Sequence, residues 1–218
     1  MKRSSKAENI LTQIAAKHTK LGDLRAIAKE VKKDHALALE LWASKNAHAR
    51  QLAILIMDKK LLTEELVDSL IDDMAENSAS EQIHLIDWLF ANQLAKDKKT
   101  IAMIESWQHS KSSLKRRTYY YYQARLRWVG QTPPPNSEAL LSTIEKDIEK
   151  EVGEVQWIMN FLAGQIGIFE EKYRARCIDL GERTGLYKDE MVAKNCTPNY
   201  LPQLIAIQVE KEKQRKRL

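Results

Sequence analysis

Apolar residues recur at helical spacing between Gly22 and Asp58, with no strand pattern among them. Three groups follow this spacing: Leu24, Ile27, Ala28 and Val31; Ala38, Leu41 and Trp42; and Ala49, Leu52, Ala53 and Ile56. Each group is the apolar stripe of one short amphipathic helix. Because a short helix buries such a stripe only against neighbouring helices, the pattern predicts an all-α fold, a solenoid of stacked helices.

The same patterning continues along the chain. Ser5 begins a capping box with Glu8, and four further residues are suited to cap helices: Asp34, Asn46, Thr63 and Asp97. We expect later helices that include Val67–Met74, Ile83–Phe90 and Ile101–Trp107, and helices over about 112–128, 138–168 and 169–183. Segment 130–136, GQTPPPN, predicts a surface loop that ends in an N-cap at Asn136.

That loop could mark a domain boundary, but the helical pattern resumes at Glu138, which favours one domain over residues 1–218. A C-terminal irregular segment and basic tail occupy about 185–218. Within them, Leu201–Gln208 is short and apolar, and Glu210–Arg217 is a charge run typical of a frayed helix end.

Composition narrows the function only slightly. The net charge of +5 and the pI of about 9.0 permit a nucleic-acid partner without requiring one. Cys177 and Cys196 form no C-x-x-C, and no His pair has zinc spacing, so we expect no metal or other cofactor and a reducing cytoplasm. The first residues are basic but include no apolar h-region, so we expect no secretory signal, and no apolar run reaches membrane length. The common phosphate-binding, nucleophile-elbow and metalloprotease motifs are also missing.

One acid stands inside an apolar run. Asp87 lies among Ile86, Trp88 and other apolar residues, with His84 one turn earlier. A carboxylate at such a position either lies on the solvent-exposed face of its helix or has a functional role. An ordinary exposed stripe of His84 and Asp87 is the simpler interpretation, and both remain open.

A second cluster combines cations and rings in the segment from Lys115 to Trp128. Successive helical residues are rotated by about 100°, so four adjacent tyrosines, 119–122, cannot all be buried. Arg117, Tyr121 and Arg125 share one face, which offers cations for phosphates and a ring for stacking, and Arg116 stands beside it. Alternatively, two tyrosines fill the core and the arginines solvate its rim. Of the five tryptophans, Trp42 continues an apolar stripe and is expected in the core.

Several motifs in order resemble one family. They are L-R-x-I-A-K from Leu24, L-W-x-S from Leu41, A-R-x-L-A-x-L-I from Ala49, and the segments 154–162, 164–167, 186–189 and 194–200. Over about residues 20 to 205 the chain is similar to the AlkD-like DNA alkylation repair glycosylases. The resemblance implies an α-α superhelix of HEAT-like antiparallel helix pairs, a curved solenoid whose basic concave groove holds duplex DNA. It also implies a monomer.

The same resemblance implies hydrolysis of the N-glycosidic bond of cationic bases, N3-methyladenine and N7-methylguanine. A cationic base is already a good leaving group, so one carboxylate can stabilise the oxocarbenium-like sugar and position water. The lesion need not enter a base pocket.

Position by position, Asp87 matches the family's catalytic aspartate and Arg117 an arginine that contacts the DNA backbone. Phe161, or its neighbour Trp157, matches an aromatic that faces the deoxyribose. The family tryptophan before the aspartate is Ile83 here, and Trp88 is the candidate substitute. Two hypotheses follow: a glycosylase for alkylated purines, or a HEAT-like scaffold that binds DNA or a protein with weak or no excision.

Overall fold

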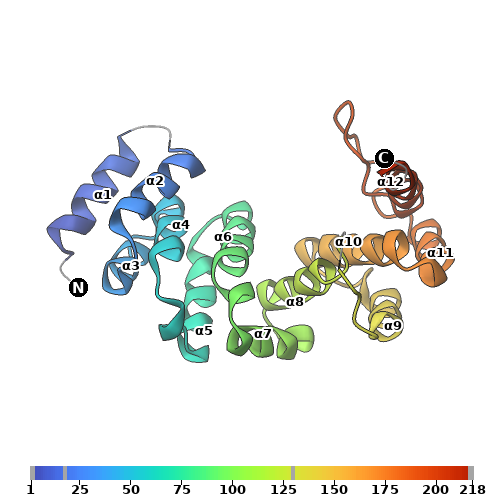
Figure 1. Ribbon diagram of the computed structural model, residues 1–218, viewed down its shortest axis with the longest axis horizontal. Helices are drawn as coiled ribbons and strands as arrows, with labels where there is room; N and C mark the ends of the chain where they lie inside the picture. The colour runs from blue at the N-terminus through green and yellow to red at the C-terminus, as the bar shows by residue number, and fades with distance from the viewer. Residues whose placement is uncertain (1–2, 17–18, 129–130, 216–218) are drawn as a thin grey trace. The chain divides into compact units, whose positions relative to one another are not determined.

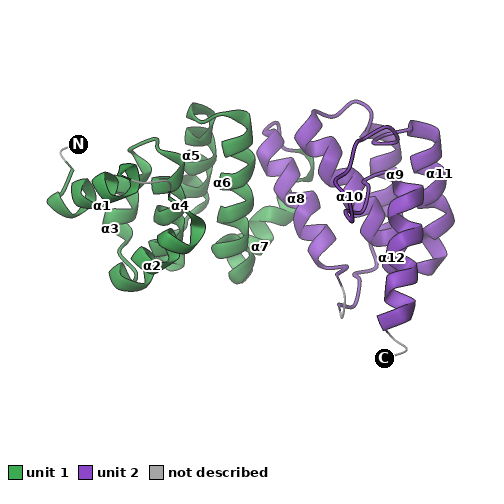
Figure 2. Ribbon diagram, turned by 90° about the horizontal axis from the view of Figure 1, so that it is seen from above, with its two compact units in different colours: residues 1–109 green, residues 110–218 purple. Residues whose placement is uncertain are grey.

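The computed structural model describes residues 3–16, 19–128 and 131–215. Within these ranges every regular element is an α-helix or a short 3-10 turn, so the all-α prediction is confirmed (Figure 1). Contacts divide the chain into two compact units, Met1–His109 and Ser110–Leu218 (Figure 2). No described helix is both long enough and apolar enough to cross a membrane.

The first unit contains seven described α-helices: α1 (Ser5–Ala15), α2 (Leu21–Val31), α3 (His35–Trp42), α4 (Ala47–Ile56), α5 (Glu64–Asp73), α6 (Ala79–Asn92) and α7 (Lys98–Glu105). Helix α4 is central and packs on α2, α3 and α6, while α1 packs mainly on α3. The even-numbered helices α2, α4 and α6 therefore form one layer. The predicted stripes face the core: Leu24, Leu41 and Leu52 are fully buried.

The second unit contains α8 (Ser113–Arg125), α9 (Ser137–Asp147), α10 (Gly153–Phe169), α11 (Arg174–Thr184) and α12 (Leu201–Arg215). Helix α10 is central and contacts each of the other four helices. Helices α8, α10 and α12 are neighbours in one layer, as α2, α4 and α6 are in the first unit. Where α11 meets α12, a Cβ on Gly181 would lie 2.7 Å from Leu201 Cβ, so this close approach requires glycine.

Helix ends test the capping predictions. The side chains of Asp34, Asn46, Thr63 and Asp97 each accept a backbone N–H at a helix start, as expected. The prediction for Ser5 is wrong, because Ser4 is the N-cap and accepts from Ala7 N. Asn136 does occupy the N-cap position of α9, but its side chain makes no capping hydrogen bond.

Two further helix predictions need correction. The continuous helical pattern expected over 138–168 is interrupted at 148–152, which separates α9 from α10. The segments expected as a short apolar stretch and a frayed end form one helix, α12, up to Arg215. Gly130 of the predicted loop and residues 216–218 of the predicted tail lie outside the described residues.

Candidate nucleic-acid interface

Asp87 lies on α6 in the first unit. Its helix begins with a capping box in which the Ser78 hydroxyl and backbone N–H both donate to Glu81 Oε2, which fixes where the helix starts. Leu85, Ile86 and other apolar residues then face the core, and Asp87 lies at its border, half-buried, with His84 exposed one turn earlier. A carboxylate at such a border is shielded on one side and can still meet a ligand.

Trp88, next to Asp87, is held by its own layer. Its indole Nε1 donates to the backbone oxygen of Gln51 on α4 at 3.1 Å. The guanidinium of Arg25, from α2, lies 5.2 Å from the ring centroid, within the range of a cation–π contact. The layer of α2, α4 and α6 therefore presents a cation, a fixed aromatic ring and, one residue along α6, a carboxylate.

In the second unit the structure brings together three predicted residues, Arg117, Trp157 and Phe161. Arg117 is only 4 % exposed, and its Nη1 donates to the Glu154 backbone oxygen at 2.8 Å. Its guanidinium lies 5.4 Å from the Trp157 ring, which stacks on Phe161 at 5.5 Å with 5° between the planes. The result is a layered cation and two parallel rings, built from α8 and α10.

Arg116 has a different environment. Its guanidinium forms two 2.7 Å hydrogen bonds with the carboxylate of Glu151 and a third with the Ser110 backbone oxygen. The hydrogen bond with Glu151 raises the pKa of Arg116. This bidentate pair anchors the start of α8, so the first role of Arg116 is structural.

The other predicted residues of α8 gather around Trp128. The guanidinium of Arg125 lies 5.3 Å from the Trp128 ring, and the Tyr121 ring is 6.4 Å away. Trp128 itself is 38 % exposed. Of the four tyrosines, Tyr119 and Tyr120 are buried, as the helical rotation predicts. However, the arginines do not simply solvate a rim, because Arg117 is buried.

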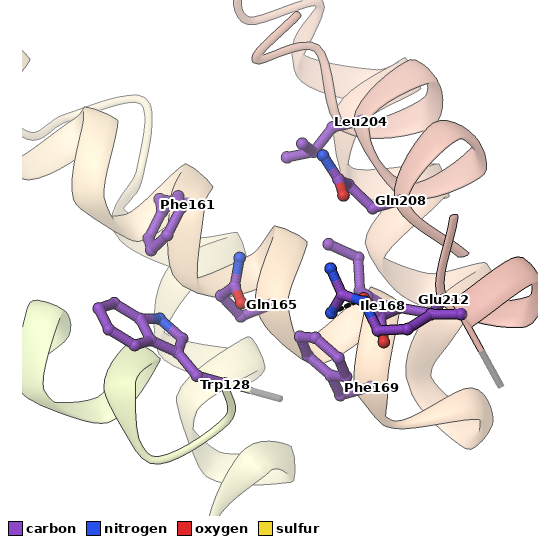
Figure 3. Close-up of a pocket in the computed structure, with 9 residues that line it drawn as sticks. Trp128, Phe161, Gln165, Ile168, Phe169, Leu204, Gln208 and Glu212 are labelled. Atoms are coloured by element: carbon purple, nitrogen blue, oxygen red, sulfur yellow. Dashed lines mark hydrogen bonds and ion pairs between the residues drawn. The ribbon is translucent and has the colours of Figure 1, made fainter. Parts of the chain in front are cut away.

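Trp128 also borders an open groove that the sequence did not reveal (Figure 3). Its volume is about 460 Å³, and Phe161, Gln165 and Phe169 of α10 face Leu204 and Gln208 of α12 across it. Gln208 donates to Thr197 Oγ1, which leaves its carbonyl oxygen as an acceptor. The exposed Trp128 ring and the half-buried phenylalanine rings, beside amide groups, suit an unstacked nucleobase, which has π faces and hydrogen-bonding edges.

Two buried arginines were also missed. Arg50 is 1 % exposed and donates to Glu76, and its guanidinium lies 5.0 Å from the Trp42 ring. Arg127 is fully buried and donates to Glu170. Their partners lie 26 and 43 residues away, so no local pattern identifies them. Among the described residues, no group of three or more His, Cys, Asp or Glu side chains is placed to hold a metal ion.

Comparisons with known proteins identify the family and the fold. A family model described as DNA alkylation repair enzyme matches residues 14–172. One solved structure is described as "a new family of proteins related to the HEAT-like repeat DNA glycosylases with affinity for branched DNA structures". It covers 99% of this chain and 90% of its own, with a TM-score of 0.66 and 19% identity, which establishes a shared HEAT-like helical fold. No curated protein matches significantly.

Proposed function

The chain belongs to the family of DNA alkylation repair enzymes, and from this premise we propose that it is a DNA glycosylase for alkylated purines. It would hydrolyse the N-glycosidic bond of cationic bases such as N3-methyladenine and N7-methylguanine in duplex DNA. It would act as a cytoplasmic monomer. The reaction needs a carboxylate and a water molecule, because the positive charge on the base already activates its departure.

The half-buried carboxylate of Asp87 is the observation that carries the proposal. As the C–N bond breaks, positive charge develops on the sugar, and a fixed carboxylate stabilises that charge most where water is partly excluded. Asp87 stands at such a border, beside the fixed ring of Trp88. The same carboxylate can orient the attacking water.

The second unit would supply DNA contacts on its own layer of α8, α10 and α12. Arg117 was expected to contact a backbone phosphate, but it is almost fully buried, so it would act through the Trp157 ring that it supports. The stacked rings of Trp157 and Phe161 would provide an apolar surface for a deoxyribose. Tyr121 and Arg125 would extend this surface along α8. Arg116 would support it by holding the start of the helix.

The proposal is tested by release of N7-methylguanine and N3-methyladenine from methylated duplex DNA. Asp87→Asn keeps the size of the side chain and removes its charge, so excision should fall about 100-fold or more. The matched control is Asp72→Asn, which neutralises an exposed aspartate on α5 of the same unit. No release by the wild type, or equal release by Asp87→Asn and wild type, would contradict the proposal.

A second candidate function is DNA binding without excision, with a preference for branched DNA. Two observations favour it: Ile83 stands where the resembling glycosylases have a tryptophan, and the solved relative is described as having affinity for branched structures. The groove beside Trp128 would receive an unpaired base at a branch point. In this case Phe161→Ala should weaken binding to a four-way junction more than binding to a linear duplex, and Asp87→Asn should change neither.

A further inference from the structure

Seven lysines follow the C-terminal ends of the three even-numbered helices of the first unit. Lys32 and Lys33 follow α2, and Lys59 and Lys60 follow α4. After α6 come the three others, Lys96, Lys98 and Lys99. We refer to these seven residues as the lysine edge. They belong to loops and helix starts, and none of them takes part in the Asp87 site.

Hydrogen bonds show that the three helix ends adjoin one another. Just beyond α2, the backbone N–H of Asp34 donates to the oxygen of Ile56, the last residue of α4, at 3.0 Å. At the end of α6, the buried amide of Gln93 donates to Ile54 O at 2.5 Å. Lys59 Nζ reaches the Lys96 backbone oxygen at 3.4 Å. The lysine edge is therefore continuous along one end of the layer.

The charge of the lysine edge is largely uncompensated. Six of the seven side chains are exposed, and Lys59 is half-buried. Within the described part of the chain, Lys33 Nζ lies 3.7 Å from the Asp58 carboxylate, and Lys60 also attracts this carboxylate electrostatically, so one acid serves two lysines. Three other acids lie nearby, Asp34, Glu64 and Asp97, but the first pairs with Lys6 and the last caps α7. A hollow of about 740 Å³, lined by Lys59, Lys60 and Lys99, opens among them.

Helix stability accounts for only part of this pattern, because the lysines that follow the C-terminal ends of α2 and α4 suit the negative end of the helix dipole. Lysines favour the negative end of the helix dipole, yet Lys98 and Lys99 lie in the first turn of α7, at its positive end. Lys32 has φ 62° and ψ −153°, a conformation that essentially only glycine adopts without strain. The chain thus carries lysine at one place where glycine would be relaxed and at two where an acid would stabilise the helix.

We propose that the lysine edge binds the phosphate backbone of duplex DNA. Adjacent packed helices lie about 8–10 Å apart, so three helix ends span roughly 16–20 Å. One strand of B-DNA carries a phosphate about every 3.4 Å of axial rise, so the edge faces about five or six phosphates. This assignment rests on the proposed function only for the identity of the partner as DNA, and it adds a binding surface separate from Asp87.

The test compares two variants of the full chain that lose the same charge. The edge variant is Lys32→Gln, Lys60→Gln, Lys98→Gln and Lys99→Gln. The control variant neutralises four exposed lysines of the second unit, Lys146, Lys172, Lys188 and Lys194, also to Gln. Affinity for a fluorescent linear duplex is measured by anisotropy between about 50 and 200 mM salt, the range over which phosphate contacts dominate. Circular dichroism and thermal unfolding check that both variants are folded.

Each phosphate contact contributes about 0.9 to the slope of log K against log salt. The edge variant should therefore have a slope shallower by about 3 to 4, and at about 100 mM salt it should bind at least tenfold more weakly. The control should change the slope by less than about 1. An unchanged slope in the edge variant, or an equal change in the control, overturns the proposal.

The outcomes also separate this proposal from the proposed function. If the wild type binds duplex DNA and excises methylated purines while the edge variant binds equally well, only the lysine edge is refuted. If the wild type does not bind duplex DNA, both fail. Vesicles that contain phosphatidylserine provide the third comparison: loss of vesicle binding by the edge variant, with DNA binding intact, would assign the edge to a membrane surface and overturn the proposal.

Discussion

Substitution of Arg127 tests how much a buried ion pair contributes to the stability of the second unit. It is fully buried just beyond the end of α8 and links three helices. Its Nε donates to Glu170 Oε1 at 3.0 Å, at the end of α10. Its Nη2 donates to Ser137 Oγ at 2.8 Å and to Asn136 Oδ1 at 2.5 Å, at the start of α9. Because Trp128 is the next residue, this network also positions the edge of the aromatic groove.

The loss of folding stability expected for Arg127→Met follows from the unpaired carboxylate of Glu170 that the substitution leaves. Among the described residues, the carboxylate of Glu170 would keep only the Ser137 hydroxyl as a donor, at 2.6 Å, and it would lose its cation while its side chain is only 12% exposed. Removing one partner of a buried ion pair typically costs about 3–5 kcal/mol, because the other charge remains unpaired. Burial lowers the pKa of Arg127, and the negative charge of Glu170 partly offsets this shift, so the buried guanidinium depends on its carboxylate partner.

Urea unfolding measures the change. Arg127→Met should lower the free energy of unfolding by about 3–5 kcal/mol. The double variant Arg127→Met with Glu170→Gln removes the stranded charge, so it should recover at least about 1 kcal/mol relative to the single variant. A loss below about 1 kcal/mol in the single variant, or additive losses in the double variant, would refute the view that Arg127 and Glu170 form one coupled buried pair.

Two further predictions concern the second unit. Burial raises the pKa of the Cys177 thiol to about 12, whereas Cys196 is exposed. A thiol-reactive disulfide reagent should therefore modify one cysteine in the native protein and two in urea, and two fast-reacting thiols in the native protein would contradict this. The Arg176 guanidinium lowers the pKa of Glu145 from 4.5, so this group's stabilisation is lost as pH falls below that value. Glu145→Gln should therefore flatten the acid side of the stability profile; an unchanged profile would exclude this contribution.

The helices were predictable because their signal is local. A buried stripe repeats every 3.6 residues, and a cap lies next to the helix it begins, so α2, α3 and α4 follow from a few neighbouring residues each. The errors arise where local signals are ambiguous. Ser4 and Ser5 are equally good caps by composition, and apolar residues on both sides of the break at 148–152 mask the separation of α9 from α10.

The candidate site was predictable only in part, for the opposite reason. Asp87 and Arg117 could be chosen because each interrupts or extends a local pattern, whereas Phe161 was chosen only through the family resemblance. Arg50 and Arg127 could not, because a buried arginine depends on a carboxylate brought close by folding. The groove beside Trp128 likewise needs α12 to pack against α10, a contact that sequence spacing does not encode.

At Lys32, the effect of backbone strain on stability can be measured separately from the effect of the side-chain charge on DNA binding. Its backbone strain should cost about 1–3 kcal/mol, and glycine relieves this strain while adding up to about 1 kcal/mol of unfolded-state entropy, so Lys32→Gly should stabilise the protein by about 1 kcal/mol. Lys32→Ala removes the same charge but keeps the strain, so it should not be stabilised. Both variants should bind duplex DNA equally, and more weakly than wild type. If glycine and alanine give the same urea midpoint, the strain is absent; if neither weakens binding, Lys32 does not contact DNA.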